Sequence, residues 1–149
     1  MRFFTLPDGR LASFQGGEVG HVAQIAKVRA HDDEDLDGGS PQQARQSGYQ
    51  KLQAGAVTVV VDVGLPASGI YAQTACAQPL ALEVVCGRDR LISNCGWSPR
   101  LTRAHAYRLT SAGSTACVGQ SSAGLVLDGH LADVLGPRLI GAASQVDFR

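Results

Sequence analysis

Histidines and cysteines are the side chains in this sequence best suited to proton transfer, nucleophilic attack or metal binding, and both are scattered. The histidines lie at His21, His31, His105 and His130. The cysteines lie at Cys76, Cys86, Cys95 and Cys117. No G-x-S-x-G motif marks a serine nucleophile, and no C-x-x-C pair marks a zinc ribbon or a redox site. Neither set forms a recognisable catalytic group.

The nearest approach to a metal site is "LDGHLAD", residues 127–133, where His130 lies between Asp128 and Asp133. Zinc needs several clustered ligands, and this stretch is more simply a turn with polar residues. The acidic run "HDDEDLD", residues 31–37, lacks the ligand spacing and the distal glutamate of a calcium loop. The sequence therefore predicts no metal and no cofactor.

The stretch "TSAGSTACVGQSS", residues 110–122, is small, uncharged and rich in hydroxyl groups. Such a texture is common in active-site loops, yet the stretch contains no histidine, carboxylate or amine that could move a proton. It is therefore either the remainder of a catalytic loop or a strand of small residues. The secondary structure and the motifs predicted around this stretch are needed to choose between these two interpretations.

The composition predicts a single domain with neither nucleic acid nor membrane as a partner. A chain of 149 residues is long enough to bury a core. Its 13 basic and 13 acidic residues cancel, so no net field attracts nucleic acid or anionic lipid. No apolar run approaches the roughly 20 residues of a membrane helix. As written, the chain has no export signal and is expected in the cytoplasm; a signal upstream of residue 1 would place it in the periplasm.

The first third of the chain combines a hairpin, a helix and a linker. "RFFTL" and "RLASF" flank the turn sequence "PDG", which predicts a hairpin. Val22, Ile25, Ala26 and Val28 have helical spacing, which predicts one short helix. Hairpin and helix together occupy residues 1–30. An acidic, glycine-rich linker, residues 31–47, has no apolar periodicity.

Residues 48–149 are expected to form the β-sandwich part of a single β-rich domain, residues 1–149. Two hairpins are predicted, one from "GYQKLQ" and "AVTVVVDV" and one from "LALEVVC" and "RLISNC". Further strands are predicted at "RAHAYRLTS", "STACVGQ" and "GLVLDG". The final "SQVDFR" alternates and then stops, so the sheet is expected to be truncated at the C-terminus. The predicted fold is mostly β, with antiparallel, sandwich-like sheets and one short N-terminal helix.

Four collinear motifs resemble the C-terminal β-domain of bacterial heparinase II/III-like proteins. They are "FFTLPDGRLASFQGGE", "SGYQKLQAGAVTVVVDVGLP", "LALEVVCGRDRLISNCG" and "LTSAGSTACVGQSSA". The resemblance implies polysaccharide lyase chemistry, in which a base removes the proton next to a uronate carboxylate in a β-elimination. It also implies an upstream α/α toroid that supplies most of the catalytic tyrosine and histidine residues.

The chain departs from the family pattern at two positions. Relatives usually carry a histidine where this sequence has Gly113, and another where it has Cys76. Glycine cannot transfer a proton, and burial in an apolar strand would leave the thiol inert. The resemblance therefore implies a fragment or degenerate copy that has no catalytic residue and is inactive alone.

Candidate contacts to an acidic polysaccharide are Tyr49, Arg88 and Arg108, which offer an aromatic face and guanidinium groups. His105 and Tyr107, next to Arg108, are interpreted as ordinary strand residues. Two alternatives to the degenerate lyase remain open. The chain could be a non-catalytic β-sandwich that binds carbohydrate or protein, or a structural domain that stabilises a larger enzyme through an interface.

Overall fold

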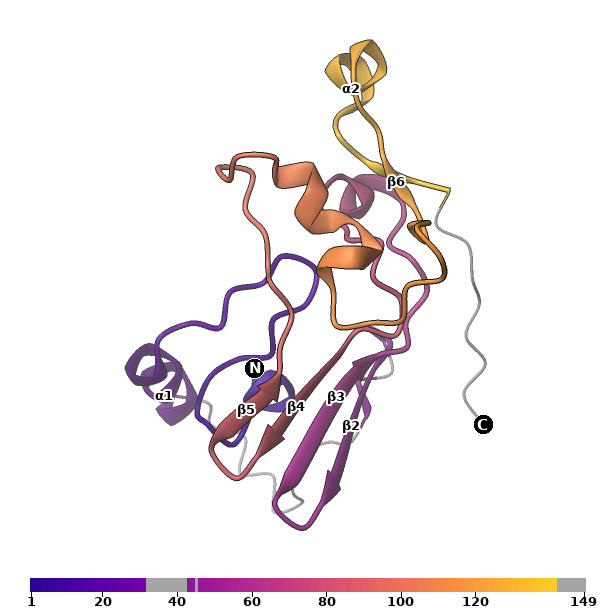
Figure 1. The fold of residues 1–149 in the computed structure, drawn as a ribbon. Helices are drawn as coiled ribbons and strands as arrows, with labels where there is room; N and C mark the ends of the chain where they lie inside the picture. The colour runs from indigo at the N-terminus through magenta and orange to yellow at the C-terminus, as the bar shows by residue number, and fades with distance from the viewer. Residues whose placement is uncertain (32–42, 45, 142–149) are drawn as a thin grey trace.

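The computed structural model describes residues 1–31, 43–44 and 46–141. Antiparallel sheets dominate the arrangement in Figure 1, and the helices between them are short. The mostly β, antiparallel fold class expected from the sequence is confirmed, as is the short N-terminal helix, α1 (Val22–Ala30). Within the described ranges no helix has the length and apolar character needed to cross a membrane.

A five-stranded antiparallel sheet forms the body of the domain. Its strands are β1 (Gln43–Ala44), β2 (Tyr49–Ala54), β3 (Val57–Asp62), β4 (Leu82–Cys86) and β5 (Asp89–Ile92). They lie in the sheet in the order in which they follow one another along the chain, and the two hairpins predicted within residues 48–149 are confirmed. The tight turns use Gly55 at φ +56° and Gly87 at φ +59°, a left-handed conformation that glycine adopts without strain.

The N-terminal segment covers one face of this sheet. The hairpin predicted here is wrong in its first half, where a 3₁₀ helix, η1 (Arg2–Phe4), replaces the strand. The chain still reverses direction around "PDG", but only an isolated antiparallel bridge between Thr5 and Leu11 joins the two halves. The buried core joins side chains of this segment to alternate residues of the central strands. Its members are Phe3, Leu6, Ala12, Phe14, Val60, Ala81 and Val85. The alternation of β3 leaves one face for this core, as the period of a strand requires.

A buried charge network fastens the N-terminal turn to the sheet. Glu83 on β4 is completely buried and lies 3.1 Å from the guanidinium of Arg90 on β5. Arg90 also binds Asp8 at 3.0 Å and donates to the carbonyl of Leu11. Burial opposes ionisation of Asp8, but hydrogen bonds from Arg90 and from the Arg10 amide outweigh it and lower the pKa of Asp8. Removal of Arg90 would leave the buried Glu83 without its counter-charge, at a cost of about 3–5 kcal/mol.

Two predicted strands are absent, and this corrects the sequence interpretation. "RAHAYRLTS" forms two 3₁₀ helices, η3 (Ala104–Arg108) and η4 (Thr110–Ala112). "STACVGQ" is irregular, because the backbone amide and hydroxyl of Ser114 both bind the side chain of Asn94, and the hydroxyl of Thr115 binds the carbonyl of Pro79. Side-chain hydrogen bonds of this kind compete with a sheet ladder.

A small second sheet consists of β6 (Leu125–Val126) and β7 (Leu139–Ile140). The strand predicted at residues 124–129 is therefore present in shortened form. Between the two strands stands a helix, α2 (His130–Leu135), at a position where the sequence had suggested only a turn. Most of the linker and the final strand predicted at 144–149 lie outside the described residues, so truncation of the sheet stays a prediction.

Candidate functional site

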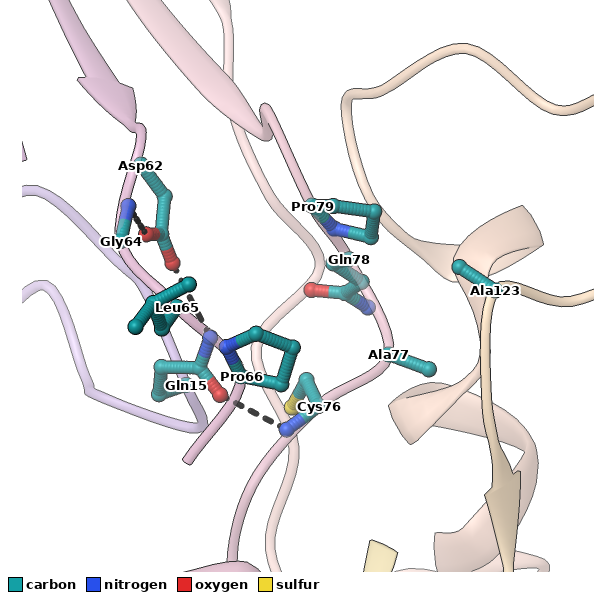
Figure 2. Close-up of a pocket in the computed structure, with 10 residues that line it drawn as sticks. All are labelled: Gln15, Asp62, Gly64, Leu65, Pro66, Cys76, Ala77, Gln78, Pro79 and Ala123. Atoms are coloured by element: carbon teal, nitrogen blue, oxygen red, sulfur yellow. Dashed lines mark hydrogen bonds between the residues drawn. The ribbon is translucent and has the colours of Figure 1, made fainter. Parts of the chain in front are cut away.

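Loops at one end of the large sheet enclose a small cavity. The volume is about 30 Å³, enough for roughly two water molecules. Figure 2 shows the lining residues, which come from the N-terminal turn, the end of β3, the segment before β4 and a later loop. They are Gln15, Asp62, Gly64, Leu65, Pro66, Cys76, Ala77, Gln78, Pro79 and Ala123. Cys76, one of the two positions at which the resemblance implies a histidine, therefore lines this cavity.

Gln15 connects the two walls of the cavity. Its side-chain amide donates to Asp62 Oδ2 at 3.0 Å, and its Oε1 accepts from the backbone N–H of Cys76 at 2.7 Å (Figure 2). The backbone of Gln15 is left-handed, with φ +51°, a conformation that costs a non-glycine residue about 1 kcal/mol or more. The two hydrogen bonds offset this strain and fix the N-terminal turn against the cavity.

Asp62 is the carboxylate of the cavity, and only 8% of the residue is exposed. Burial raises its pKa, and hydrogen bonds from Gln15, from the Gly64 amide and from the hydroxyl of Tyr49 oppose this effect in part. Burial, followed by the neighbouring Asp62 charge, raises the pKa of Tyr49 far above its ordinary value. The tyrosine therefore stays protonated and donates to the carboxylate.

Cys76 presents a thiol that is inert at neutral pH. The residue is 6% exposed, and burial raises the pKa of the thiol to about 11. The positive charge of Arg108 and the indole N–H of Trp97 lower it only in part. Because the thiolate is the nucleophile and the metal ligand, a protonated thiol supplies neither function. The thiol is buried and its pKa raised, as the sequence suggested, but the expected apolar strand is wrong, because Cys76 lies in an irregular segment before β4.

Gly113 has no space for a side chain. Its backbone is extended at φ −102°, which any residue can adopt. A Cβ atom built on it, however, would lie 2.7 Å from both Cγ and Cδ of Gln78. Gln78 is 7% exposed and is held by hydrogen bonds to the carbonyls of Tyr107 at 3.0 Å and Leu109 at 3.2 Å. Gln78 also lines the cavity, so both positions at which the resemblance implies a histidine border this region.

The three predicted saccharide contacts are not brought together. Tyr49 lies at the Asp62 end of β2, where its ring packs 5.0 Å from the rings of Phe4 and Phe14. Arg88 is exposed on the β4–β5 turn at the other end of the sheet. Five residues of strand separate the two ends, a distance of about 17 Å. The role of these residues in saccharide binding stays a prediction.

Arg108 has a structural position that its sequence context did not reveal. It is completely buried, and its guanidinium donates to the backbone carbonyls of Ala75, Ala72 and Pro137. The indole of Trp97 stacks on it, with the ring centroid 5.0 Å from the guanidinium carbon. Arg108 therefore ties together three segments that are distant in sequence.

A larger cleft of about 560 Å³ lies beside the small cavity, with Gln15 in the wall of both. Trp97, Gln73 and the exposed His105 line it. Sequence reasoning singled out neither Trp97 nor the cavity residues Gln15, Asp62 and Gln78. Gln15 and Asp62 lie within two of the quoted motifs, but nothing in those motifs indicates that the two side chains meet. In the described part of the chain, no group of three histidine, cysteine or acidic residues could hold a metal ion.

Comparison with known proteins places these features in a family. A family model described as heparinase II/III-like, C-terminal, matches residues 37–146. The FtsZ-localized protein C of Caulobacter vibrioides (strain NA1000 / CB15N) is 48% identical over 148 residues. The match covers 99% of this chain and 25% of the relative, so the chain spans about a quarter of that protein's length. No solved structure matches.

Proposed function

The chain belongs to the family of heparinase II/III-like C-terminal domains, and we propose that it is a catalytically silent member that acts as a binding module of a longer protein. The observation that carries this proposal is the exclusion of a side chain at Gly113 by the buried amide of Gln78. The raised pKa of the Cys76 thiol supports the same conclusion, because neither position offers a group that could transfer a proton at neutral pH.

The relative suggests where such a module works. That protein is named for its localisation with FtsZ, and it matches almost the whole of this chain. We infer that this domain belongs to a protein of the same kind, in which the domain contributes contacts rather than chemistry. The domain is about a quarter of the relative, so the remaining chain, for which the family resemblance implies an upstream toroid, is its first partner.

A replacement experiment tests the proposed location. The quarter of the Caulobacter protein that matches this chain is exchanged for residues 1–149, and the chimera is followed by fluorescence microscopy together with FtsZ. The proposal expects localisation with FtsZ as in the unaltered protein. A chimera present at normal level but spread through the cell would contradict it.

A lyase assay tests the proposed silence. The purified chain is incubated with heparin and heparan sulfate, and the absorbance of the unsaturated uronate product is recorded. No rise above a buffer control is expected. A steady rise that scales with protein concentration would overturn the claim that the domain is silent alone.

The cleft of about 560 Å³ favours a second candidate, non-catalytic binding of an acidic polysaccharide. Its volume lies in the range of ordinary ligand sites, and Trp97 offers an aromatic surface at its wall. Because Trp97 is the one tryptophan in the sequence, its fluorescence reports directly on this cleft. Heparin titration should change the emission in a saturable way; a flat titration removes this candidate.

A further inference from the structure

Helix α2 carries an apolar stripe that nothing in the described part of the chain covers. Leu131, Val134 and Leu135 follow the i, i+3, i+4 spacing that places side chains on one face of a helix. Their exposed fractions are 62%, 81% and 46%, and no residue of α2 is buried. His130 and Asp133, 3.7 Å apart, supply the polar side chains of the same helix. A stripe of this kind matches the anchors by which helices enter apolar grooves.

The helix cannot owe its formation to its own sequence. It has six residues, whereas isolated helices shorter than about 12–15 residues are marginal in water. It is bounded by two glycines, Gly129 at φ +65° and Gly136 at φ +78°. These residues set the ends of the helix but bury nothing. Apolar contacts with a partner would supply the burial that α2 lacks.

The base of the helix is anchored firmly. Strands β6 and β7 pair beneath it, and Leu139 of β7 is buried against Ala75 and Ala77. The buried Arg108 donates to the carbonyl of Pro137, directly after the helix. In Figure 1 the helix stands away from the five-stranded sheet at the end of this paired stalk. The stalk thus presents the stripe at a defined place, which is what a docking element requires.

We propose that α2 docks its stripe of Leu131, Val134 and Leu135 into an apolar groove on the remaining part of the longer polypeptide. The proposal rests on the part of the proposed function that makes this chain a module of a longer protein, and not on localisation with FtsZ. The length comparison identifies the occupant, since about three quarters of the relative lies outside the match. Contacts between domains of one chain bury enough surface to cover such a helix.

Hydrogen exchange in two contexts tests the proposal. The amides of residues 130–135 are measured in the isolated chain and in the full-length Caulobacter chimera described above. We expect rapid exchange in the isolated chain and exchange slowed by about tenfold or more in the chimera, because docking closes the helix to solvent. The double variant Leu131→Asp/Val134→Asp should abolish the difference. Leu91→Asp, on β5 and 62% exposed, is the matched control and should leave it intact.

Each outcome decides the proposal. Equal exchange in both contexts overturns it, as does a double variant that keeps full protection. Protection that grows with the concentration of the isolated chain assigns the stripe to a second copy and also overturns it. An insoluble chimera counts against it, because the docking groove then fails to accept α2. Loss of FtsZ localisation with α2 still protected would sink the proposed location alone, so the two failures can be distinguished.

Discussion

Substitution of Gly113 by alanine probes the closed space at the position where the family resemblance implies a histidine. The added methyl group would lie 2.7 Å from two carbon atoms of Gln78, well inside van der Waals contact. Gln78 cannot move aside cheaply, because it is buried and bound to the carbonyls of Tyr107 and Leu109. Overpacking of this kind costs about 1–3 kcal/mol. The lower entropy of the unfolded alanine chain returns about 0.4–1 kcal/mol, so a net loss of roughly 0.5–2 kcal/mol is expected.

The partner substitution completes a double-mutant cycle. Gln78→Ala leaves the two carbonyls without their donor and should cost about 1–3 kcal/mol. In the double variant the methyl group at position 113 occupies space that Gln78 has vacated. The double variant should therefore lose less stability than the sum of the single variants, with a coupling of about 1–2 kcal/mol. Urea unfolding followed by tryptophan fluorescence and circular dichroism measures all three variants.

The control is Gly119→Ala, where the added Cβ meets no atom within 4 Å but the backbone φ is +62°. It should cost stability through the backbone alone, with no coupling to Gln78→Ala. Additivity of Gly113→Ala and Gln78→Ala to within about 0.5 kcal/mol would refute the claim that Gln78 closes the site. A stable Gly113→His variant with measurable lyase turnover would refute it more directly.

Three further predictions concern buried ionisable groups. Burial, assisted by the charge of Arg29, lowers the pKa of Lys51 to about 8. Between pH 8 and about 10.5 the unfolded chain therefore binds a proton that the folded chain does not, and the folded chain becomes more stable as the pH rises. Urea unfolding should show the stability of the wild type, relative to Lys51→Met, rising by roughly 1–3 kcal/mol over that range. At pH 8, iodoacetamide should modify the exposed Cys95 and Cys117, whereas Cys76 should stay unmodified until urea unfolds the chain. Peptide mass spectrometry measures the modification of each cysteine. Modification of Cys76 before unfolding would contradict its burial and its raised pKa. Arg108→Lys should lose about 3 kcal/mol or more of stability in urea unfolding, because an ammonium group cannot reproduce the guanidinium that donates to three carbonyls. The control is Arg88→Lys at an exposed position, which should change stability by less than about 0.5 kcal/mol.

The elements that the sequence predicted well are those whose signal is local. Strand β3 alternates in burial and is joined to β2 at Gly55, and β4 and β5 are joined at Gly87. The helix at Val22–Ala30 buries Ile25, one of the four apolar residues that predicted it. In each case neighbouring residues and one turn glycine contain the necessary information.

The 103–111 segment was misread because its alternation does not reflect a sheet. Arg108 is the deciding residue: it is buried and bound to carbonyls from segments about 30 residues away on either side of it. Ala77 and Thr110 are joined in the same way, through the hydroxyl of Thr110 and the carbonyl of Ala77. These long-range hydrogen bonds stabilise two 3₁₀ helices. The nine residues of the segment contain no pattern from which such distant partners could be predicted.

The site was predictable only where family motifs marked it. The comparison of motifs identified Cys76 and Gly113, and the structure places both beside Gln78 or the cavity that Gln78 lines. Gln15 could not be found in this way, because its partners Asp62 and Cys76 lie 47 and 61 residues further along the chain. Its left-handed backbone is likewise a consequence of the tertiary contacts that hold it.

The hydrogen bonds around the cavity argue that any function of this chain lies elsewhere on its surface. The side chain of Gln15 is used on both its oxygen and its nitrogen, and Asp62 accepts from Gln15, Gly64 and Tyr49. A substrate could engage these groups only by breaking such contacts, at about 1–3 kcal/mol for each buried group left unsatisfied. The apolar stripe on α2 requires no such exchange, because its side chains already face solvent and gain free energy when covered. A domain whose cavity is lined by polar groups already bonded to one another, and whose helix presents three apolar side chains that the described residues leave exposed, is better suited to contact than to catalysis.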